Sequence, residues 1–263
     1  VDGPEIEIVD DSPNNDLEWG LQLGGQDITV RGLAIHSFGN DWFLFDNANL
    51  LARGGARRLT VYDCVLGSEA HADMAPVGDV NGGPNFQALG IDDGKFYRNY
   101  VAYSETMGGF LRSGCSGWEI YHNDFNNNGI DDPICDGLDL ADFCEDNIVR
   151  ENLFRNNRGN GFDSYLAAGD LLIENNTVYN NGLSGTETSG MRIYGSKGDT
   201  ISKNIIRDNV GAGILITSAA QKHNITRNSI YNNGNVTSTG VPTASNQIGI
   251  DLLSSSESHK TGD

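Results

Sequence analysis

Apolar residues return at a regular distance along the chain, in short runs separated by polar and glycine-rich segments. An Asn followed two residues later by an apolar residue recurs through the chain, and Gly32 and Asp63 occupy the same slot near the start. The successive spacings are 31, 36, 24, 29, 24, 28 and 24 residues. A base period of 24 residues with loop insertions is typical of a solenoid built from short β-strands. The recurring Asn residues are Asn99, Asn123, Asn152, Asn176, Asn204 and Asn228.

Two columns of mostly apolar residues accompany this Asn. The first lies two residues after it: Ala34, Val65, Val101, Phe125, Phe154, Val178, Ile206 and Ile230. The second lies three residues before it: Thr29, Thr60, Phe96, Ile120, Val149, Ile173, Ile201 and Ile225. The leucine-rich repeat signature is absent, so each unit is predicted to be one coil of a parallel β-helix, in which coils stack at roughly 4.8 Å. We expect the Asn column to form left-handed corners whose side-chain amides hydrogen-bond along the stack.

Segments such as DNIVRENLFRNNRGNGFDSY, LLIENNTVYNNG and NSIYNNG resemble the right-handed parallel β-helix repeat proteins of the pectate-lyase-like superfamily. The resemblance covers about residues 27–253 and implies an all-β, right-handed parallel β-helix of about eight coils. We predict one domain over residues 1–263, with residues 1–26 as an N-terminal coil or cap region. Residues 254–263 are expected to start a truncated C-terminal extension. Because neither end carries a recognisable cap, the chain is expected to be part of a larger polypeptide.

A second short strand begins at a glycine in the later units: Gly137, Gly161, Gly190, Gly213 and Gly249. The residue after each glycine is apolar and is predicted to face inward, so the next residue faces outward. The outward column contains Asp139, Asp163, Arg192, Leu215 and Asp251, and two residues farther on lie Ala141, Tyr165, Tyr194 and Thr217. Two carboxylates, a guanidinium and two aromatic rings are therefore expected on adjacent coils, flanked by Asp136 and Asp142.

This strip suggests binding or cleavage of an acidic polysaccharide. Carboxylates of Asp136, Asp139, Asp142 and Asp163 could hold Ca²⁺, which binds oxygen ligands and can bridge to a uronate carboxylate. The ion would acidify the proton on C5 of the sugar, and a base would then cause β-elimination or epimerisation.

Each side chain of the strip has an expected role. The catalytic candidates are Asp139, Asp163 and Arg192, with Arg192 as a carboxylate clamp because a guanidinium normally stays protonated. Tyr165 and Tyr194 are candidates for stacking on sugar rings. The loops at 126–136 and 182–189 precede the strands of Asp139 and Arg192 and are expected to wall the strip.

The segment from DGLDLADF to IENNTVYNNG is similar to the calcium-dependent pectate lyases of polysaccharide lyase family nine. The resemblance implies that Asp163 corresponds to the last Asp of that family's calcium-binding motif and that a lysine serves as the base. Gly159 and Asn160 stand where that motif has acidic residues, and no lysine follows near LADF.

Charge and hydropathy narrow the choice of partner. There are 36 acidic residues against 17 basic ones, a formal net charge of -19, which argues against nucleic acid because phosphate binding needs clustered Lys and Arg. No apolar run approaches the roughly 18 residues of a membrane-spanning helix. We therefore expect an extracellular or cell-surface domain that is structural or adhesive and binds polysaccharide or cell-surface glycan along the Asp/Tyr face.

Two alternatives to the adhesive interpretation stay open. One is a Ca²⁺-dependent polysaccharide lyase or epimerase acting on a uronate-containing polymer. The other is a surface ion-pair ladder of Asp139, Asp163 and Arg192 that contributes little to stability or function.

The four cysteines permit three pairings in an oxidising compartment. Cys115 and Cys144 both follow the second strand of adjacent coils, so a disulfide between these two is predicted.

Overall fold

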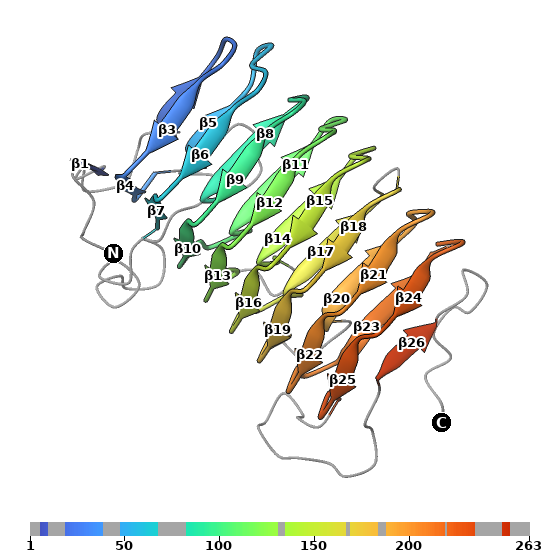
Figure 1. Ribbon diagram of the computed structural model, residues 1–263. Coiled ribbons are helices and arrows are strands. Elements are labelled where there is room, and N and C mark those ends of the chain that lie inside the picture. Colours follow the sequence, from blue (N-terminus) through green and yellow to red (C-terminus); the bar gives the residue numbers. More distant parts are fainter. Residues whose placement is uncertain are drawn as a thin grey trace.

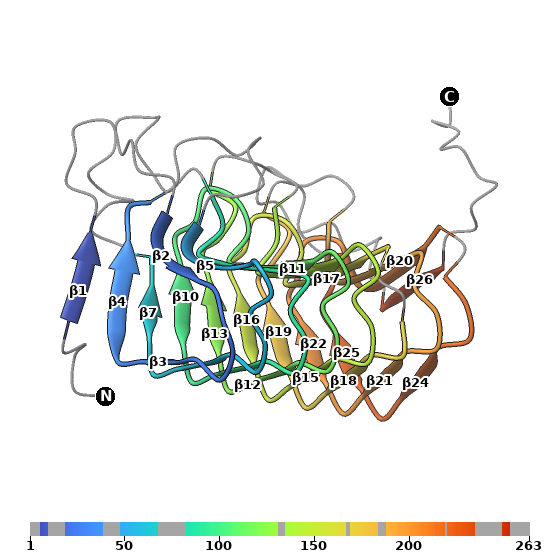
Figure 2. The ribbon, with the colours of Figure 1, turned by 90° about the horizontal axis from the view of Figure 1, so that it is seen from above.

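The computed structural model describes residues 6–9, 19–38, 48–67, 83–130, 135–166, 169–183, 188–218, 220–234 and 249–252. The regular elements within these residues are all β-strands, which form three parallel sheets (Figure 1). Sheets A and B each have nine strands and sheet C has eight. Figure 2 shows the three sheets as separate sides of one elongated stack. The predicted all-β parallel β-helix of about eight coils is confirmed.

Successive strands pass from sheet B to sheet C to sheet A, and the chain then enters the next coil. Sheet A contains β1 (Ile6–Val9), β4 (Leu33–His36), β7 (Val65–Leu66), β10 (Tyr100–Ala102), β13 (Asp124–Asn126), β16 (Leu153–Arg155), β19 (Thr177–Tyr179), β22 (Ile205–Arg207) and β25 (Ser229–Tyr231). Sheet B contains β2 (Trp19–Leu23), β5 (Ala48–Ala52), β8 (Phe86–Leu89), β11 (Gly109–Arg112), β14 (Leu138–Ala141), β17 (Phe162–Tyr165), β20 (Ser189–Tyr194), β23 (Ala212–Thr217) and β26 (Ile250–Leu252). Sheet C contains β3 (Thr29–Arg31), β6 (Thr60–Tyr62), β9 (Lys95–Tyr97), β12 (Glu119–Tyr121), β15 (Ile148–Arg150), β18 (Leu172–Glu174), β21 (Thr200–Ser202) and β24 (Asn224–Thr226).

The core is a set of stacked columns between the sheets. Equivalent residues of successive coils are neighbours, as Phe125 and Phe154 are on β13 and β16, with ring centroids 5.1 Å apart. Phe96 of sheet C packs against Phe125 across the core, with ring centroids 6.2 Å apart. All three rings are buried. Burial of one or two apolar side chains per strand builds a continuous core, because every coil adds its own side chains to the stack.

The predicted alignment is wrong by one residue in the first two units. Val61 pairs with Phe96, and Leu66 pairs with Val101. The Asn slot of that coil is therefore held by Cys64, whose backbone N donates to Asn99 Oδ1 at 3.0 Å. Asp63 precedes the slot, and the error arose because Thr60 and Val65 are themselves acceptable strand residues.

The Asn column forms the predicted ladder. From Asn99 to Asn228, each Asn donates its backbone N–H to the Oδ1 of the Asn one coil further, over distances of 2.9–3.0 Å. Each side-chain Nδ2 donates to the same oxygen at 3.0–3.1 Å. The amide of Asn152 also donates to the carbonyl of Ile120 at 2.9 Å. These bonds satisfy buried polar groups at a corner that would otherwise lack partners.

The left-handed corner lies one residue earlier than predicted. Glu151, Asn175 and Lys203 have φ values of 57°, 55° and 58°, and each immediately precedes a ladder Asn. The ladder Asn itself is therefore held by its side-chain bonds, and the residue before it makes the turn. This explains why the turning position tolerates Glu and Lys, whose side chains point away from the buried amides.

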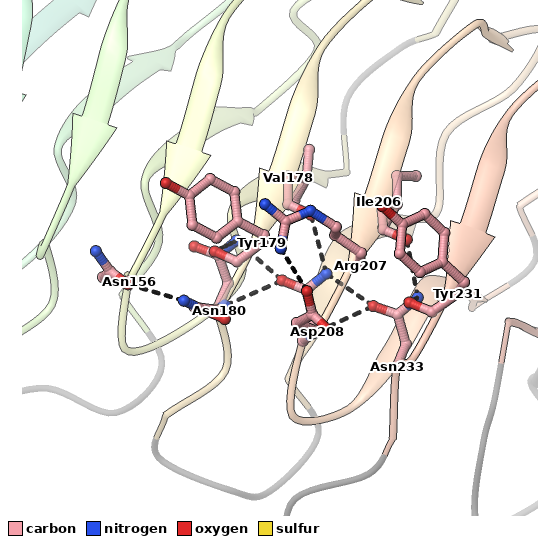
Figure 3. Close-up of polar contacts among 11 residues, drawn as sticks. Asn156, Val178, Tyr179, Asn180, Ile206, Arg207, Asp208, Tyr231 and Asn233 are labelled. Atoms are coloured by element: carbon pink, nitrogen blue, oxygen red, sulfur yellow. Dashed lines mark hydrogen bonds and ion pairs between the residues drawn. The ribbon is translucent and has the colours of Figure 1, made fainter.

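A second Asn ladder, which the sequence analysis missed, lies five residues after the first. It contains Asn128, Asn157, Asn181, Asn209 and Asn233, joined by Nδ2–Oδ1 bonds of 2.9–3.0 Å. Figure 3 shows a corner of this ladder, where Asn233 Nδ2 donates to the Ile206 carbonyl at 3.0 Å. The doubled NN of the sequence is the signal for this ladder, since the first Asn makes the turn and the second joins the stack.

Several predictions concern residues that the structure does not describe. Residues 254–263 lie outside the described part of the chain, and so do residues 1–5 and 10–18 of the predicted cap region. Residues 131–134 and 184–187 of the two predicted wall loops also lie outside it.

Candidate functional site

The predicted strip lies on the outer face of sheet B, on β14, β17 and β20. Asp139 pairs with Asp163, and Asp163 pairs with Arg192. Tyr165 pairs with Tyr194 two residues farther along the same strands. The predicted register of the strip is therefore confirmed.

Glycines set the start of these strands. A Cβ atom on Gly161 would lie 2.8 Å from Asn181 Nδ2 and 2.8 Å from a methyl group of Val178. A Cβ atom on Gly137 would lie 2.5 Å from the Gly161 carbonyl. Only glycine allows this approach between the corner ladder and the strand, so the second Asn ladder fixes where Asp139 and Asp163 lie.

The carboxylates face outward from the sheet, yet they are buried. Asp163 is 0% exposed and Asp139 is 6% exposed, whereas the Arg192 side chain is 21% exposed. Arg192 donates to both carboxylate oxygens of Asp163, with a distance of 2.9 Å from Nε to Oδ1. The Asp163–Arg192 ion pair of the surface-ladder alternative is therefore formed, but its surface location is wrong, because both Asp139 and Asp163 are buried.

A third carboxylate completes the cluster. Ligand oxygens of Asp136, Asp139 and Asp163 all lie within 4.8 Å of one another. Asp136 Oδ1 accepts from both the backbone N and the Nδ2 of Asn160, the latter at 2.9 Å. Asn160 Oδ1 in turn accepts from the Ser189 N and Oγ at 2.8 and 2.9 Å. Asp136 is thus held in place by a short polar chain across three coils.

Asp139 has an unsatisfied oxygen. Its Oδ1 is buried and has no hydrogen-bond partner among the described residues. A buried acceptor of this kind has a free-energy cost, and a bound cation or a proton would remove it.

Burial and repulsion act together on two of the acids. Burial, and then the charge of Asp163, raise the pKa of Asp136 well above its usual value. Burial and the charges of Asp163 and Asp136 raise the pKa of Asp139 in the same way. Burial lowers the pKa of Arg192, but attraction to Asp163 outweighs it, so the net pKa is raised and Arg192 stays protonated. The cluster therefore favours an added positive charge and Arg192 is no base.

The aromatic part of the strip lies beside the guanidinium. The Tyr165 and Tyr194 rings are stacked with centroids 4.8 Å apart, and Arg192 Cζ lies 5.6 Å from the Tyr165 ring centroid. Tyr165 is 38% exposed. Solvent, and any ligand, can therefore meet Arg192 and Tyr165 while the acids lie beneath.

The structure does not bring every predicted residue into the cluster. Asp142 turns the chain at φ 53° after β14 and is not among the grouped carboxylates. Asn160 and Ser189, which the sequence analysis did not assign, belong to it. Their signal was positional: Asn160 precedes Gly161 as Asp136 precedes Gly137, which places both on one column.

The predicted Cys115–Cys144 disulfide is not formed in the structure. Cys115 and Cys144 are buried thiols that form no disulfide, and so is Cys64. The Cys115 and Cys144 thiols are nevertheless neighbours on adjacent coils, as predicted. The hydrogen bond between them, together with burial, raises the pKa of Cys144.

An open groove lies at another part of the coil, at the corner between sheets C and A. Its lining residues are His122, Asn123, Asp124, Glu151, Asn152, Leu153, Asn175 and Thr177. It shares no residue with the acidic cluster, and its His122 and Glu151 form a half-exposed pair at 3.1 Å.

In the described part of the chain, no helix is long and apolar enough to cross a membrane.

Several solved structures are similar to this fold. The A-module of mannuronan C-5 epimerase AlgE4 from Azotobacter vinelandii superimposes with a TM-score of 0.62 at 17% identity, covering 87% of this chain and 60% of that one. The A-module of AlgE6 from the same organism gives 0.57 at 18%, covering 88% and 63%. The periplasmic alginate epimerase AlgG gives 0.59 at 14%, covering 94% and 54%. The chain thus spans less than two thirds of these proteins, and the likeness shows the fold.

Sequence profiles agree with the fold. No curated protein matches the chain in sequence. A profile described as "Periplasmic copper-binding protein (NosD)" matches residues 135–258. A profile described as "Right handed beta helix region" matches residues 19–185, which is more than half of the chain. The chain therefore belongs to the right-handed β-helix family.

Proposed function

We propose that this chain is part of a cation-dependent enzyme, an epimerase or a lyase, that acts on a uronate-containing polysaccharide such as alginate. The observation that carries the proposal is the buried group of Asp136, Asp139 and Asp163 beneath the partly exposed Arg192 and Tyr165. The similarity of the fold to alginate epimerases supports this enzymatic alternative better than the structural or adhesive interpretation.

The ligand set suits a hard divalent cation. Ca²⁺ takes about six to eight oxygen ligands, whereas copper favours imidazole and sulfur. The three grouped ligand residues are all carboxylates, and one of their oxygens has no partner among the described residues. Asp136, Asp139 and Asp163 would hold the ion, which would polarise a uronate carboxylate when bound. These donors fit calcium better than the copper in the description of the matched profile.

This chain's own residues supply binding and proton transfer. Arg192 would bind the uronate carboxylate, using donors that Asp163 leaves free. Arg192 is held protonated, so in the exposed strip the proton on C5 would pass to a phenolate oxygen of Tyr165 or Tyr194, once that hydroxyl group has given its own proton to solvent. In elimination the electron pair of the C5–H bond forms the C4–C5 double bond while the C4–O bond breaks. In epimerisation a proton returns to C5 from the other face.

A location outside the cytoplasm follows from the same proposal. The matched profile and the AlgG neighbour are both described as periplasmic. An extracellular or cell-surface place is the finer form of this proposal.

The test is an activity assay on mannuronan, mixed alginate and pectate, with calcium or with a chelator. Elimination gives ultraviolet absorbance of an unsaturated uronate, and epimerisation in D₂O gives deuterium at C5. We expect one of these products, lost in Asp163→Asn and in Arg192→Lys. If no polymer gives either product but a glycan array still shows binding, the adhesive interpretation replaces the enzymatic one.

A further inference from the structure

The corner that follows β14 carries an exposed aromatic residue in an unusual backbone conformation. Asp142 and Phe143 have φ values of 53° and 67°, so two consecutive residues are left-handed. Phe143 is 74% exposed. A bulky side chain seldom takes this conformation, because its Cβ crowds the backbone.

The preceding coil shows what the corner itself requires. Leu111 pairs with Leu140, which places Gly114 opposite Phe143, and Gly114 has φ 81°. Gly114 N donates to the Asp142 carbonyl at 2.9 Å, so the two corners follow the same path. Glycine adopts this conformation without strain. Phe143 therefore adds strain at a position that glycine fills one coil earlier, and its exposed ring gains little packing in return.

Strain without compensating packing points to binding. The neighbouring coils continue the edge on which Phe143 lies: its N–H donates to the Leu166 carbonyl at 3.1 Å, and Leu166 follows Tyr165 at the end of β17. Leu166 and Tyr165 are also exposed. Phe143 is thus the outermost member of an edge that leads to the Tyr165–Tyr194 stack and to Arg192.

We infer that Phe143 is a sugar-stacking residue that holds a pyranose ring of the polysaccharide, one or more residues away from the sugar bound at Arg192. This inference rests on the proposed function. Isolated aromatic rings among polar groups suit the C–H face of a sugar, and here Asp142 and Arg192 border the apolar edge. A protein partner would need a larger continuous apolar surface.

The residue acts on binding only, because it has no group that can transfer a proton. Its removal is therefore expected to weaken binding of oligomers long enough to reach the edge, while the shortest substrate that fills the Arg192 subsite is bound as before. The chemical step at a saturating concentration of polymer stays unchanged.

The test compares Phe143→Gly, Phe143→Leu and Phe143→Trp with the wild type. For Phe143→Gly we expect KM for long oligomers to rise about three- to tenfold, with kcat unchanged and a thermal midpoint equal to or above that of the wild type. Phe143→Trp should keep the KM of the wild type, whereas Phe143→Leu should raise KM as Phe143→Gly does. Asn180→Gly, at a left-handed corner of sheet A, serves as the control and should leave KM unchanged.

Three distinguishable outcomes would overturn the inference. An active Phe143→Gly enzyme with wild-type KM removes the stacking role. A lowered thermal midpoint together with equal KM for long and short oligomers assigns Phe143 a structural role instead. A wild type that neither converts nor binds any uronate polymer removes the proposed function, and the inference fails with it.

Discussion

At the residue scale, the unsatisfied oxygen of Asp139 is the most informative atom of the cluster. Asp163 is paired with Arg192, and Asp136 is bonded to Asn160, but Asp139 Oδ1 has no described partner. Without a cation, Asp139 is therefore a buried acid beside two others. Under the proposed function, this position would supply a cation ligand at the expense of stability.

We predict that Asp139→Asn stabilises the protein when a chelator is present at neutral pH. The neutral amide removes repulsion with Asp163 and Asp136, so the free energy of unfolding should rise by about 1–2 kcal/mol. Urea denaturation measures this change. The same variant should lose most of the stabilisation that calcium gives the wild type.

The matched control is Asp124→Asn on sheet A. Asp124 accepts from Arg155 Nε and Nη2 at 3.0 and 2.9 Å and is partly exposed. Its loss should destabilise by about 1 kcal/mol or less, with no effect of calcium. Destabilisation by Asp139→Asn in the chelator would show that its carboxylate has a partner that stabilises the fold.

The residues of the strip could be placed from sequence, but their burial could not. Alternation along a strand fixes which side chains leave the sheet, so Asp139, Asp163 and Arg192 were aligned correctly. Whether an outward side chain is covered depends on segments from other coils, which have no period. Asp142 was misplaced for a related reason, because alternation ends where the strand ends.

At the element scale, hydrogen bonds join one coil to the next at the corners as well as along the strands. The strands are mostly three or four residues long, too short to persist alone. The two Asn ladders join each corner to the next through bonds at 2.9–3.1 Å. Because each amide is both donor and acceptor, losing one affects two neighbours.

We predict that Asn152→Ala lowers the free energy of unfolding by about 3 kcal/mol or more. The change removes the acceptor of the Asn123 backbone N, one of the two acceptors of Asn123 Nδ2, and the side-chain donor to the Ile120 carbonyl. Chemical denaturation measures the loss. Asn224→Ala on the exposed β24 is the control and should change stability by about 0.5 kcal/mol or less. Equal effects of the two substitutions would mean that the ladder adds no stability.

Sequence periodicity predicted the ladder of Asn152 and the parallel stacking of strands, because equivalent positions meet in every coil. It did not locate the turning residue, since Glu151 and Lys203 carry no signature of a left-handed corner. It also misaligned the first two units, because neither has an Asn in the slot: the second has Cys64 there and the first has Leu33. The errors lie where residue type alone is ambiguous, and a single backbone hydrogen bond resolves them.

At the scale of the whole molecule, the formal net charge of -19 and the acidic cluster both lower stability through repulsion between carboxylates. Every carboxylate adds repulsion as pH rises, but those at the surface are screened by salt. Asp136 and Asp139 are buried and are not. Their effect on stability can therefore be separated from that of the general charge by comparison with a variant that lacks only these two charges.

We predict that the stability of the protein in chelator falls as pH rises, whereas the additional stabilisation by calcium grows. The pKa values of Asp136 and Asp139 are raised in the folded state above the usual value of 3.8, so between the two values the folded state binds more protons than the unfolded state. Stability in chelator is thus highest near or below pH 4 as far as these groups are concerned. It falls as the pH rises from about 4 toward the raised values.

Calcium competes with those protons, so its stabilising effect should grow as pH rises through the same window. Thermal midpoints measured from pH 4 to 8, with chelator and with calcium, test this. The variant Asp136→Asn/Asp139→Asn keeps the surface charge but should show a shallower fall in chelator and almost no response to calcium. Parallel curves for wild type and variant would place the pH dependence on the surface carboxylates and would remove the cluster as the calcium site.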